Sequence, residues 1–298
     1  MHLKNKFDVG KFTILAEMQP PKGVNVSGMV NSAVRVQNQV DAFLVPEMGN
    51  AVMRMSSLGG AMLLQRKGLE TIMQVNCRDR NRIALQADLL AAYGGGIINV
   101  MGVSGEDPGL GDHHQTKAVN DIELMTLFKA ISALQTGKDL AGNELAGAPS
   151  FLVGATVNAR ATGDELEKEL SRMAEKAAAG VDFFIAPPVF DLGAIAPFLE
   201  KVDLKKNRII PTVMLLKSVG MARYLDRHLS VTISQDLIKR MMRAPDKAVE
   251  SLSIATKTIS VLEEAGFAGV LISAMGWEDK LQKLLDLSLI HISEPTRP

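Results

Sequence analysis

The chain has 298 residues, of which 47% are hydrophobic and 22% charged, and its formal net charge is zero. The neutral balance, the lack of a run of Lys and Arg, and the 4% aromatic content argue against nucleic-acid binding. Apolar runs are shorter than the roughly 20 residues that cross a bilayer, and the N-terminus lacks a signal-peptide core, so we expect a cytoplasmic protein with no membrane partner.

Short apolar segments rich in β-forming residues predict strands at residues 12–18, 42–45, 70–75, 97–103, 151–155, 182–186, 208–214 and 268–273. Prolines at positions 20–21 and 187–188 should end the first and sixth strands, because proline cannot donate to a sheet. Amphipathic stretches predict helices at residues 31–40, within 48–66, and at 81–93, 121–134, 164–179, 219–229, 234–242, 246–265 and 277–285.

The alternation of strands and helices predicts a single-domain (β/α)8 TIM barrel over residues 1–286. A doubly wound open sheet is the alternative, but no G-x-G-x-x-G follows any strand. Residues 287–298 abandon the periodicity of the preceding helix and look like read-through of cloning sequence. We therefore expect these residues to be a non-native tail.

In a parallel barrel, side chains that follow the strands share one mouth. Glu17 ends the first strand, where partial loss of water should raise its pKa and suit a general acid. A structural ion pair at the barrel rim is the alternative interpretation.

After the fourth strand, Glu106 and Asp107 have three possible roles, as an acid/base pair, as metal ligands or as ordinary loop carboxylates. Metal binding with Asp112, His113 and His114 is disfavoured, because adjacent histidines do not easily aim at one ion. The single cysteine, Cys77, excludes an intramolecular disulfide, and we expect it to be a buried apolar residue. No metal site is predicted.

Glu169 and Lys176 lie seven residues apart on one predicted helix and hence on one face. They belong to a solvated face, or they face the mouth and hold a ribose and a diphosphate.

Five motifs, in order, make the chain resemble the methylenetetrahydrofolate reductase family of flavin-dependent barrels. They are AEMQPPKG at 16–23, the long block from MQVNCRDRN to VSGEDP at 73–108, VGATVNA at 153–159, EKAAAGVDFFIAPPVFD at 175–191 and RIIPTVMLLKSVGMARYL at 208–225.

The resemblance implies FAD at the barrel mouth and hydride transfer through flavin N5, from a reductant to the methylene carbon of a bound folate. Glu17 matches the family's general acid, and Glu106 matches the acidic residue between flavin and pterin, usually an aspartate. The positions that the resemblance assigns to the cofactor are Asn76, Ser104, Thr156, Glu169 and Lys176.

The substrate side departs from the family. Pro187 and Met221 stand where the resemblance implies two glutamines against the pterin, and Leu225 replaces a phenylalanine. Thr156 and Gln74 replace a tyrosine and a histidine. Cofactor binding is thus better supported than folate specificity.

The leading hypothesis is reduction of 5,10-methylenetetrahydrofolate to 5-methyltetrahydrofolate, with NAD(P)H or a protein as electron donor. The alternatives are a pterin-binding methyltransferase barrel that serves a corrinoid protein, and a catalytically silent flavin subunit of a redox complex. A homo-oligomer is compatible with each.

Overall fold

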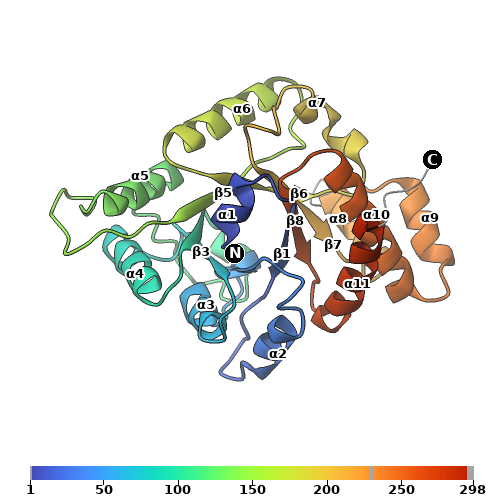
Figure 1. Ribbon diagram of the computed structural model, residues 1–298, viewed down its shortest axis with the longest axis horizontal. Coiled ribbons are helices and arrows are strands. Elements are labelled where there is room, and N and C mark those ends of the chain that lie inside the picture. The colour runs from blue at the N-terminus through green and yellow to red at the C-terminus, as the bar shows by residue number, and fades with distance from the viewer. Residues whose placement is uncertain (1, 229–230, 294–298) are drawn as a thin grey trace.

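The computed structural model, which describes residues 2–228 and 231–293, is a closed barrel of parallel strands (Figure 1). Each strand pairs with the next in sequence, and β8 pairs with β1 to close the sheet. The fold predicted from the sequence is confirmed. The strands are β1 (Thr13–Glu17), β2 (Ala42–Val45), β3 (Thr71–Asn76), β4 (Asn99–Val103), β5 (Leu152–Thr156), β6 (Phe183–Pro188), β7 (Ile209–Met214) and β8 (Gly269–Ser273).

Helices surround the barrel as an outer ring (Figure 1). The α-helices are α1 (Leu3–Asp8), α2 (Ser27–Arg35), α3 (Ser57–Gln65), α4 (Arg82–Gly94), α5 (Leu124–Gln135), α6 (Gly163–Ala178), α7 (Ala196–Leu199), α8 (Val219–His228), α9 (Gln235–Arg243), α10 (Lys247–Glu264) and α11 (Leu281–Ser293). Short 3₁₀ turns are η1 (Gly49–Ala51), η2 (Pro108–Leu110), η3 (Leu192–Ile195) and η4 (Glu278–Lys280). None of the described helices combines the length and the apolar character needed to cross a membrane.

The first helix, α1, was not predicted, and it lies across the end of the barrel that faces the viewer in Figure 1. Leu3 and Phe7 are buried and join the cluster of side chains inside the barrel. The Phe7 ring lies 5.7 Å from that of Phe183, and the Leu3 amide donates to Glu70 at 2.9 Å. Two apolar residues four apart therefore close the amino-terminal end of the barrel, which leaves the carboxyl end as the open mouth.

The predicted end of the sixth strand is wrong, because β6 continues through Pro187 and Pro188. The pairing with β7 slips between Ala186 and Pro188, and such a bulge accommodates residues that have no N–H to donate. The hydroxyl of Thr212 donates to the carbonyl of Ala186 at 2.8 Å. A β7 side chain thus satisfies the Ala186 carbonyl where the pairing of the two strands slips.

Two other predicted helices lie at different positions. The helix expected at residues 31–40 runs from Ser27 to Arg35, and a series of tight turns follows it before β2. The helix expected at 277–285 begins as η4 and continues as α11, which crosses the predicted boundary after residue 286. The tail at 287–298 stays a prediction, and residues 294–298 lie outside the described part of the chain.

The closure between β1 and β8 depends on a glycine. Gly269 pairs with Thr13, and a Cβ atom at position 269 would lie 2.3 Å from the Thr13 carbonyl oxygen and 2.2 Å from its hydroxyl. Both strands are fixed in a closed sheet, so neither is free to move away.

We therefore predict that Gly269→Ala lowers the free energy of unfolding by about 1–3 kcal/mol or more through overpacking. Urea unfolding followed by circular dichroism measures the effect. Gly28→Ala is the matched control, because nothing lies within 4 Å of a Cβ there and the residue is inside α2. The control should be neutral or stabilising by roughly 0.5–1 kcal/mol. Equal midpoints for wild type and Gly269→Ala would contradict this view of the closure.

Candidate functional site

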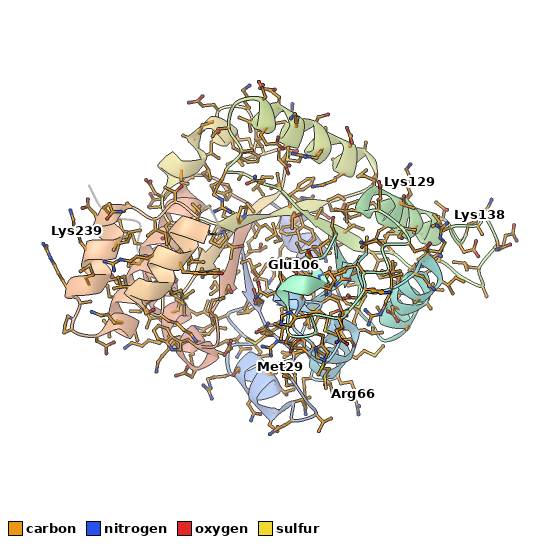
Figure 2. The ribbon with its side chains drawn as sticks, turned by 180° about the vertical axis from the view of Figure 1, so that it is seen from behind. Met29, Arg66, Glu106, Lys129, Lys138 and Lys239 are labelled. Carbon is orange, nitrogen blue, oxygen red and sulfur yellow. The ribbon has the colours of Figure 1, made fainter. Side chains whose placement is uncertain are left out.

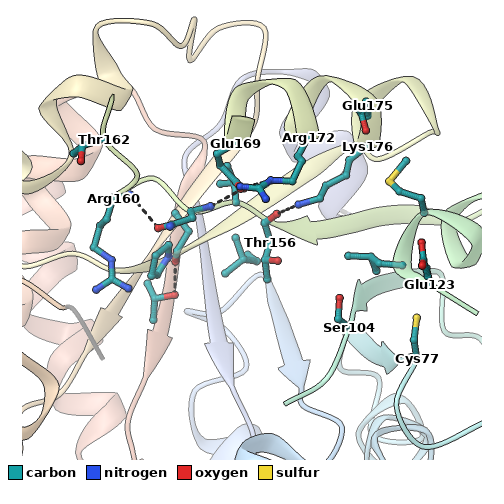
Figure 3. Close-up of a pocket in the computed structure, with 18 of the residues that line it drawn as sticks. Cys77, Ser104, Glu123, Thr156, Arg160, Thr162, Glu169, Arg172, Glu175 and Lys176 are labelled. Atoms are coloured by element: carbon teal, nitrogen blue, oxygen red, sulfur yellow. Dashed lines mark hydrogen bonds and ion pairs between the residues drawn. The ribbon is translucent and has the colours of Figure 1, made fainter. Parts of the chain in front are cut away.

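The open end of the barrel holds a cavity of about 1370 Å³, larger than the roughly 300–1,000 Å³ of a typical small-ligand site (Figure 3). It is lined from the ends of several strands, from the first turn of α5 and from α6. Five residues predicted to contact cofactor or substrate line it together, namely Ser104, Thr156, Glu169, Lys176 and Pro187. The parallel sheet thus brings these five side chains from three successive strand–helix units into one space.

Glu169 and Lys176 point from α6 toward the end of β5 (Figure 3), which excludes the solvated-face interpretation. Their exposed fractions are 6% and 8%. The Lys176 ammonium donates to the Thr156 carbonyl at 2.8 Å, and Glu169 accepts from the amide of Asn158 at 2.9 Å. Burial lowers the pKa of Lys176, and the nearby Glu169 carboxylate partly offsets this effect.

Two further cations, Arg160 and Arg172, line the same cavity and were missed by the sequence reasoning (Figure 3). Arg172 donates to Glu169 at 3.1 Å from one helical turn away, a spacing from which it was predictable. Arg160 follows β5 by four residues and belongs to no recognisable pattern; burial lowers its pKa. With Lys176, the cavity contains three cations whose donors suit phosphate oxygens.

Glu17 ends β1 and is half-buried. Burial raises the pKa of its carboxyl group, a hydrogen bond from Ser273 opposes that shift, and the charge of Glu278 adds to it. The raised pKa agrees with the sequence prediction, and the perturbing groups include no cation. Glu17 lies on the β8–β1–β2 side of the mouth and is not among the residues that line the large cavity.

Glu106 lies on the loop after β4, above the open end of the barrel in the view of Figure 2. Its side chain is 54% exposed, and its carboxylate oxygen is 3.8 Å from Nη1 of Arg78. Met221 is in the first turn of α8, partly buried against the apolar cluster that α8 forms with α9 and α10. Neither residue lines the large cavity.

Asn76 is almost fully buried, at 1% exposure, and its side chain is engaged by the protein itself. It donates to Asp79 at 2.9 Å and to the Glu47 carbonyl at 3.4 Å, and it accepts from the Asp79 amide at 3.2 Å. In this structure Asn76 therefore shapes the loop after β3.

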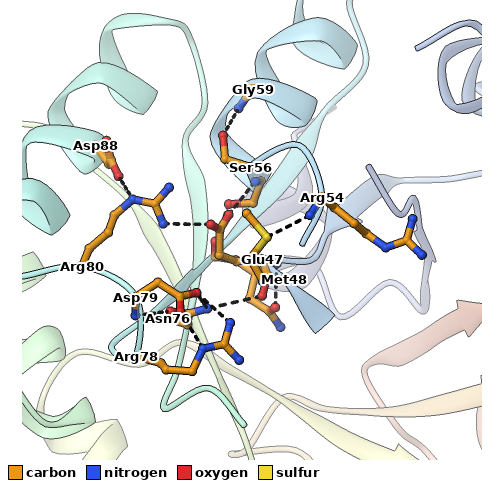
Figure 4. A network of polar contacts seen from close by, with 12 residues as sticks. Glu47, Met48, Arg54, Ser56, Gly59, Asn76, Arg78, Asp79, Arg80 and Asp88 are labelled. Carbon is orange, nitrogen blue, oxygen red and sulfur yellow. Dashed lines mark hydrogen bonds and ion pairs between the residues drawn. The ribbon is translucent and has the colours of Figure 1, made fainter. Parts of the chain in front are cut away.

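Glu47 is a buried carboxylate that the sequence reasoning missed (Figure 4). It accepts from Arg80 at 2.8 Å and from the amide of Ser57 at 2.5 Å, and Arg80 also pairs with Asp88 at 2.9 Å. The available signal was an acidic residue two positions after an apolar strand, in VPEM. Glu47 connects the end of β2 to the start of α3 and to the loop after β3.

Among the residues that the structure describes, no group of three or more His, Cys, Asp or Glu side chains is arranged to hold a metal ion. His113 contacts Asp112 at 2.9 Å, whereas His114 contacts the Gly109 carbonyl at 3.2 Å. Cys77 is buried, as predicted, and burial raises its pKa to about 11. Its thiol is therefore protonated at neutral pH and is a poor nucleophile.

Comparison with known proteins identifies a family. The family model for methylenetetrahydrofolate reductase matches residues 2–287. Among solved structures, an EDTA monooxygenase (EmoA) from Chelativorans sp. BNC1 is similar, with a TM-score of 0.54, 10% sequence identity and 95% of each chain covered. At this identity, the likeness concerns the fold alone. Comparison with the curated proteins finds no match.

Because burial raises the pKa of Glu17, this carboxyl group should make the stability of the protein depend on pH. At a pH between 4.5, the ordinary pKa of a glutamate, and the raised pKa of Glu17, the folded protein holds a proton that the unfolded chain releases. The stability contributed by this group is therefore complete below pH 4.5 and is lost as the pH rises through the folded pKa.

We expect Glu17→Gln to be more stable than the wild type at pH 8 and to differ little from it at pH 4. Thermal unfolding at a series of pH values measures the difference in melting temperature. Glu144→Gln is the control, because it makes the same substitution at an exposed position. A difference that is the same at pH 4 and pH 8 would contradict the assigned cause.

Proposed function

Because the chain belongs to the methylenetetrahydrofolate reductase family, we propose that it is an FAD-dependent oxidoreductase that reduces 5,10-methylenetetrahydrofolate to 5-methyltetrahydrofolate. The observation that carries the proposal is Glu17, a carboxyl group at the mouth whose pKa is raised by burial. A carboxyl group that binds its proton more tightly than usual is what the folate half of this reaction requires.

The lining of the cavity fits FAD. Lys176, Arg160 and Arg172 place three cations around a diphosphate. Lys176 uses only one of its three donors on Thr156, whereas Arg172 is shared with Glu165 and Glu169. Val157 and Ile185 offer apolar surface for a ring system. When bound, FAD would accept hydride from a reductant and return it to the methylene carbon of the folate.

The protein's own contribution begins with a proton. The methylene bridge joins two nitrogens, and protonation of the leaving nitrogen by Glu17 opens the bridge to an iminium carbon that accepts hydride. Ser273 donates to the carboxyl group and fixes its orientation. Reprotonation from solvent restores Glu17 after each turnover, because the side chain keeps some contact with solvent.

Glu106 contributes charge rather than a proton in this proposal. Its carboxylate on the loop over the mouth would face the cationic iminium carbon and stabilise it electrostatically. Its acidic group reaches one methylene further than the aspartate usual in the family.

Pro187 keeps a second possibility open. It lines the cavity and has no side-chain donor, and Met221 packs in an apolar cluster. A one-carbon carrier other than tetrahydrofolate, a methyltransferase serving a corrinoid protein and a silent flavin subunit are therefore alternatives. The electron donor also has two alternatives, NAD(P)H or a protein.

The test of the proposal is a spectrum followed by a titration. FAD-loaded protein should be yellow, and anaerobic 5-methyltetrahydrofolate should bleach it by the reverse reaction. A colourless protein after incubation with FAD would favour the methyltransferase. Bound flavin that neither folate nor NAD(P)H reduces would favour the silent subunit.

Glu17→Gln should bind FAD as the wild type does and lose folate-dependent bleaching by roughly 10²–10⁴-fold, the range for a general acid. Stopped-flow absorbance measures bleaching, and fluorescence quenching measures FAD affinity. Loss of FAD binding in parallel with activity would assign Glu17 to the cofactor instead.

Lys176→Ala should weaken FAD, because it removes a buried ammonium from the cavity. We expect a tenfold or larger rise in Kd, on the order of 1.4 kcal/mol or more. Lys168→Ala is the control on the same helix, since that lysine is 67% exposed and pairs with Glu165. Unchanged affinity in Lys176→Ala would restrict this lysine to holding the end of β5.

A further inference from the structure

Arg78, at the start of the loop after β3, is a buried arginine whose three nitrogens are all used. Its side chain is 4% exposed. Nε and Nη2 donate to the two carboxylate oxygens of Asp79, at 2.6 and 2.7 Å. The remaining nitrogen, Nη1, donates to the backbone carbonyl of Glu106 at 3.0 Å and lies 3.8 Å from its carboxylate.

We propose that Arg78 is the positioning residue for Glu106, holding the loop after β4 so that this carboxylate stays over the mouth. The inference rests on the proposed function, because it requires Glu106 to act on the substrate. Arg78 lies in the 73–108 block that carries the family resemblance, but the sequence analysis assigned it no role.

The anchor behind Arg78 is a continuous set of hydrogen bonds (Figure 4). Asn76 donates to the same Asp79 carboxylate that receives the guanidinium and also contacts the Glu47 carbonyl. Against the cost of burial, the bonds from Arg78 and Asn76 lower the pKa of Asp79. Asp79 is therefore a stable anion to which Arg78 is fixed from the ends of β2 and β3.

Only arginine has the geometry for both tasks. Its planar fork gives one edge to a bidentate carboxylate and leaves another nitrogen for a second partner, whereas a lysine ammonium is a single point. The charged neighbours of Arg78 are Asp79, Glu106 and Glu47, all acidic, and the bonds to Asp79 raise the pKa of Arg78. The group therefore remains charged at any pH used in an assay.

The loop that carries Glu106 is built around residue 78, through both its side chain and its backbone. Gly105 has φ +87°, and a Cβ atom there would lie 2.8 Å from Cβ of Arg78. At the far end of the same loop, the Val119 amide donates to the Arg78 carbonyl at 2.7 Å. One residue thus holds the loop at both ends.

The backbone contact matters more than the ion pair. The Glu106 carboxylate is about half exposed, and such an ion pair contributes little by itself. The Nη1 bond to the Glu106 carbonyl is shielded and directional. Arg78 should therefore affect where Glu106 lies rather than its charge.

A double-mutant cycle tests the proposal in the FAD-loaded full chain, with bleaching by 5-methyltetrahydrofolate as the measurement. Arg78→Lys should slow bleaching by about 10–100-fold, since small displacements of reacting groups cost that much. FAD affinity should not change. In the Glu106→Gln background, the same substitution should slow bleaching by less than about twofold, because the group that Arg78 positions is already lost.

Arg80→Lys is the matched control, because Arg80 belongs to the same network but pairs with Glu47 and Asp88. Its effect should be equal in both backgrounds. Hydrogen exchange on the flavin-free protein adds a readout independent of activity. Residues 105–107 should exchange faster in Arg78→Lys, whereas residues 156–158 should not.

The inference is overturned if the Arg78→Lys protein is bleached at the wild-type rate or loses affinity for FAD in parallel. It is also overturned if the substitution slows bleaching equally in the wild-type and Glu106→Gln backgrounds. Failure of the wild type itself to be bleached by 5-methyltetrahydrofolate would instead reject the proposed function. The two failures are therefore distinguishable.

Discussion

The arrangement of the site depends on the pairing of β8 with β1. This pairing closes a parallel sheet in which every strand ends at the same rim. Glu17 at the end of the first strand and Ser273 at the end of the last are 256 positions apart, yet they share a hydrogen bond across the closure. An open sheet with the same strand order would place these residues at opposite edges. The chemical environment of Glu17 is therefore a product of the closed topology.

The mouth contains two kinds of ionisable group that are withdrawn from solvent. Glu47 with Arg80 and Asp79 with Arg78 are paired, and their bonds connect neighbouring loops. Such pairs are costly to break and specify one arrangement. Glu17 is different, because the groups that perturb it are a hydroxyl and a second carboxylate. A carboxyl group that is buried without a neighbouring cation binds its proton more tightly than usual, which suits an acid, and it costs stability at a pH that ionises the unfolded chain.

The sequence predicted the parts of this molecule that depend on local pattern. The strands, the barrel and the shared face of Glu169 and Lys176 all follow from periodicity, and the structure confirms them. It did not predict α1, because two apolar residues in a six-residue helix carry little signal until the barrel interior is there to receive them. Contacts between loops, such as that of Arg78 with Glu106, were equally inaccessible, since they join positions with no fixed spacing.

The sixth strand shows why substrate recognition is the least predictable part. A pterin is held by donors and acceptors at fixed positions, and β6 presents Pro187 and Pro188, which have no N–H. The carbonyl of Ala186 is already bonded to Thr212, so this strand end also has one acceptor fewer to offer. Recognition must then come from other strand ends. The β8–β1 side contains Glu17, Ser273 and Glu278, a polar group independent of the positions where the family places its glutamines. A pterin bound here would thus be oriented by the side of the mouth that carries Glu17 rather than by the end of β6.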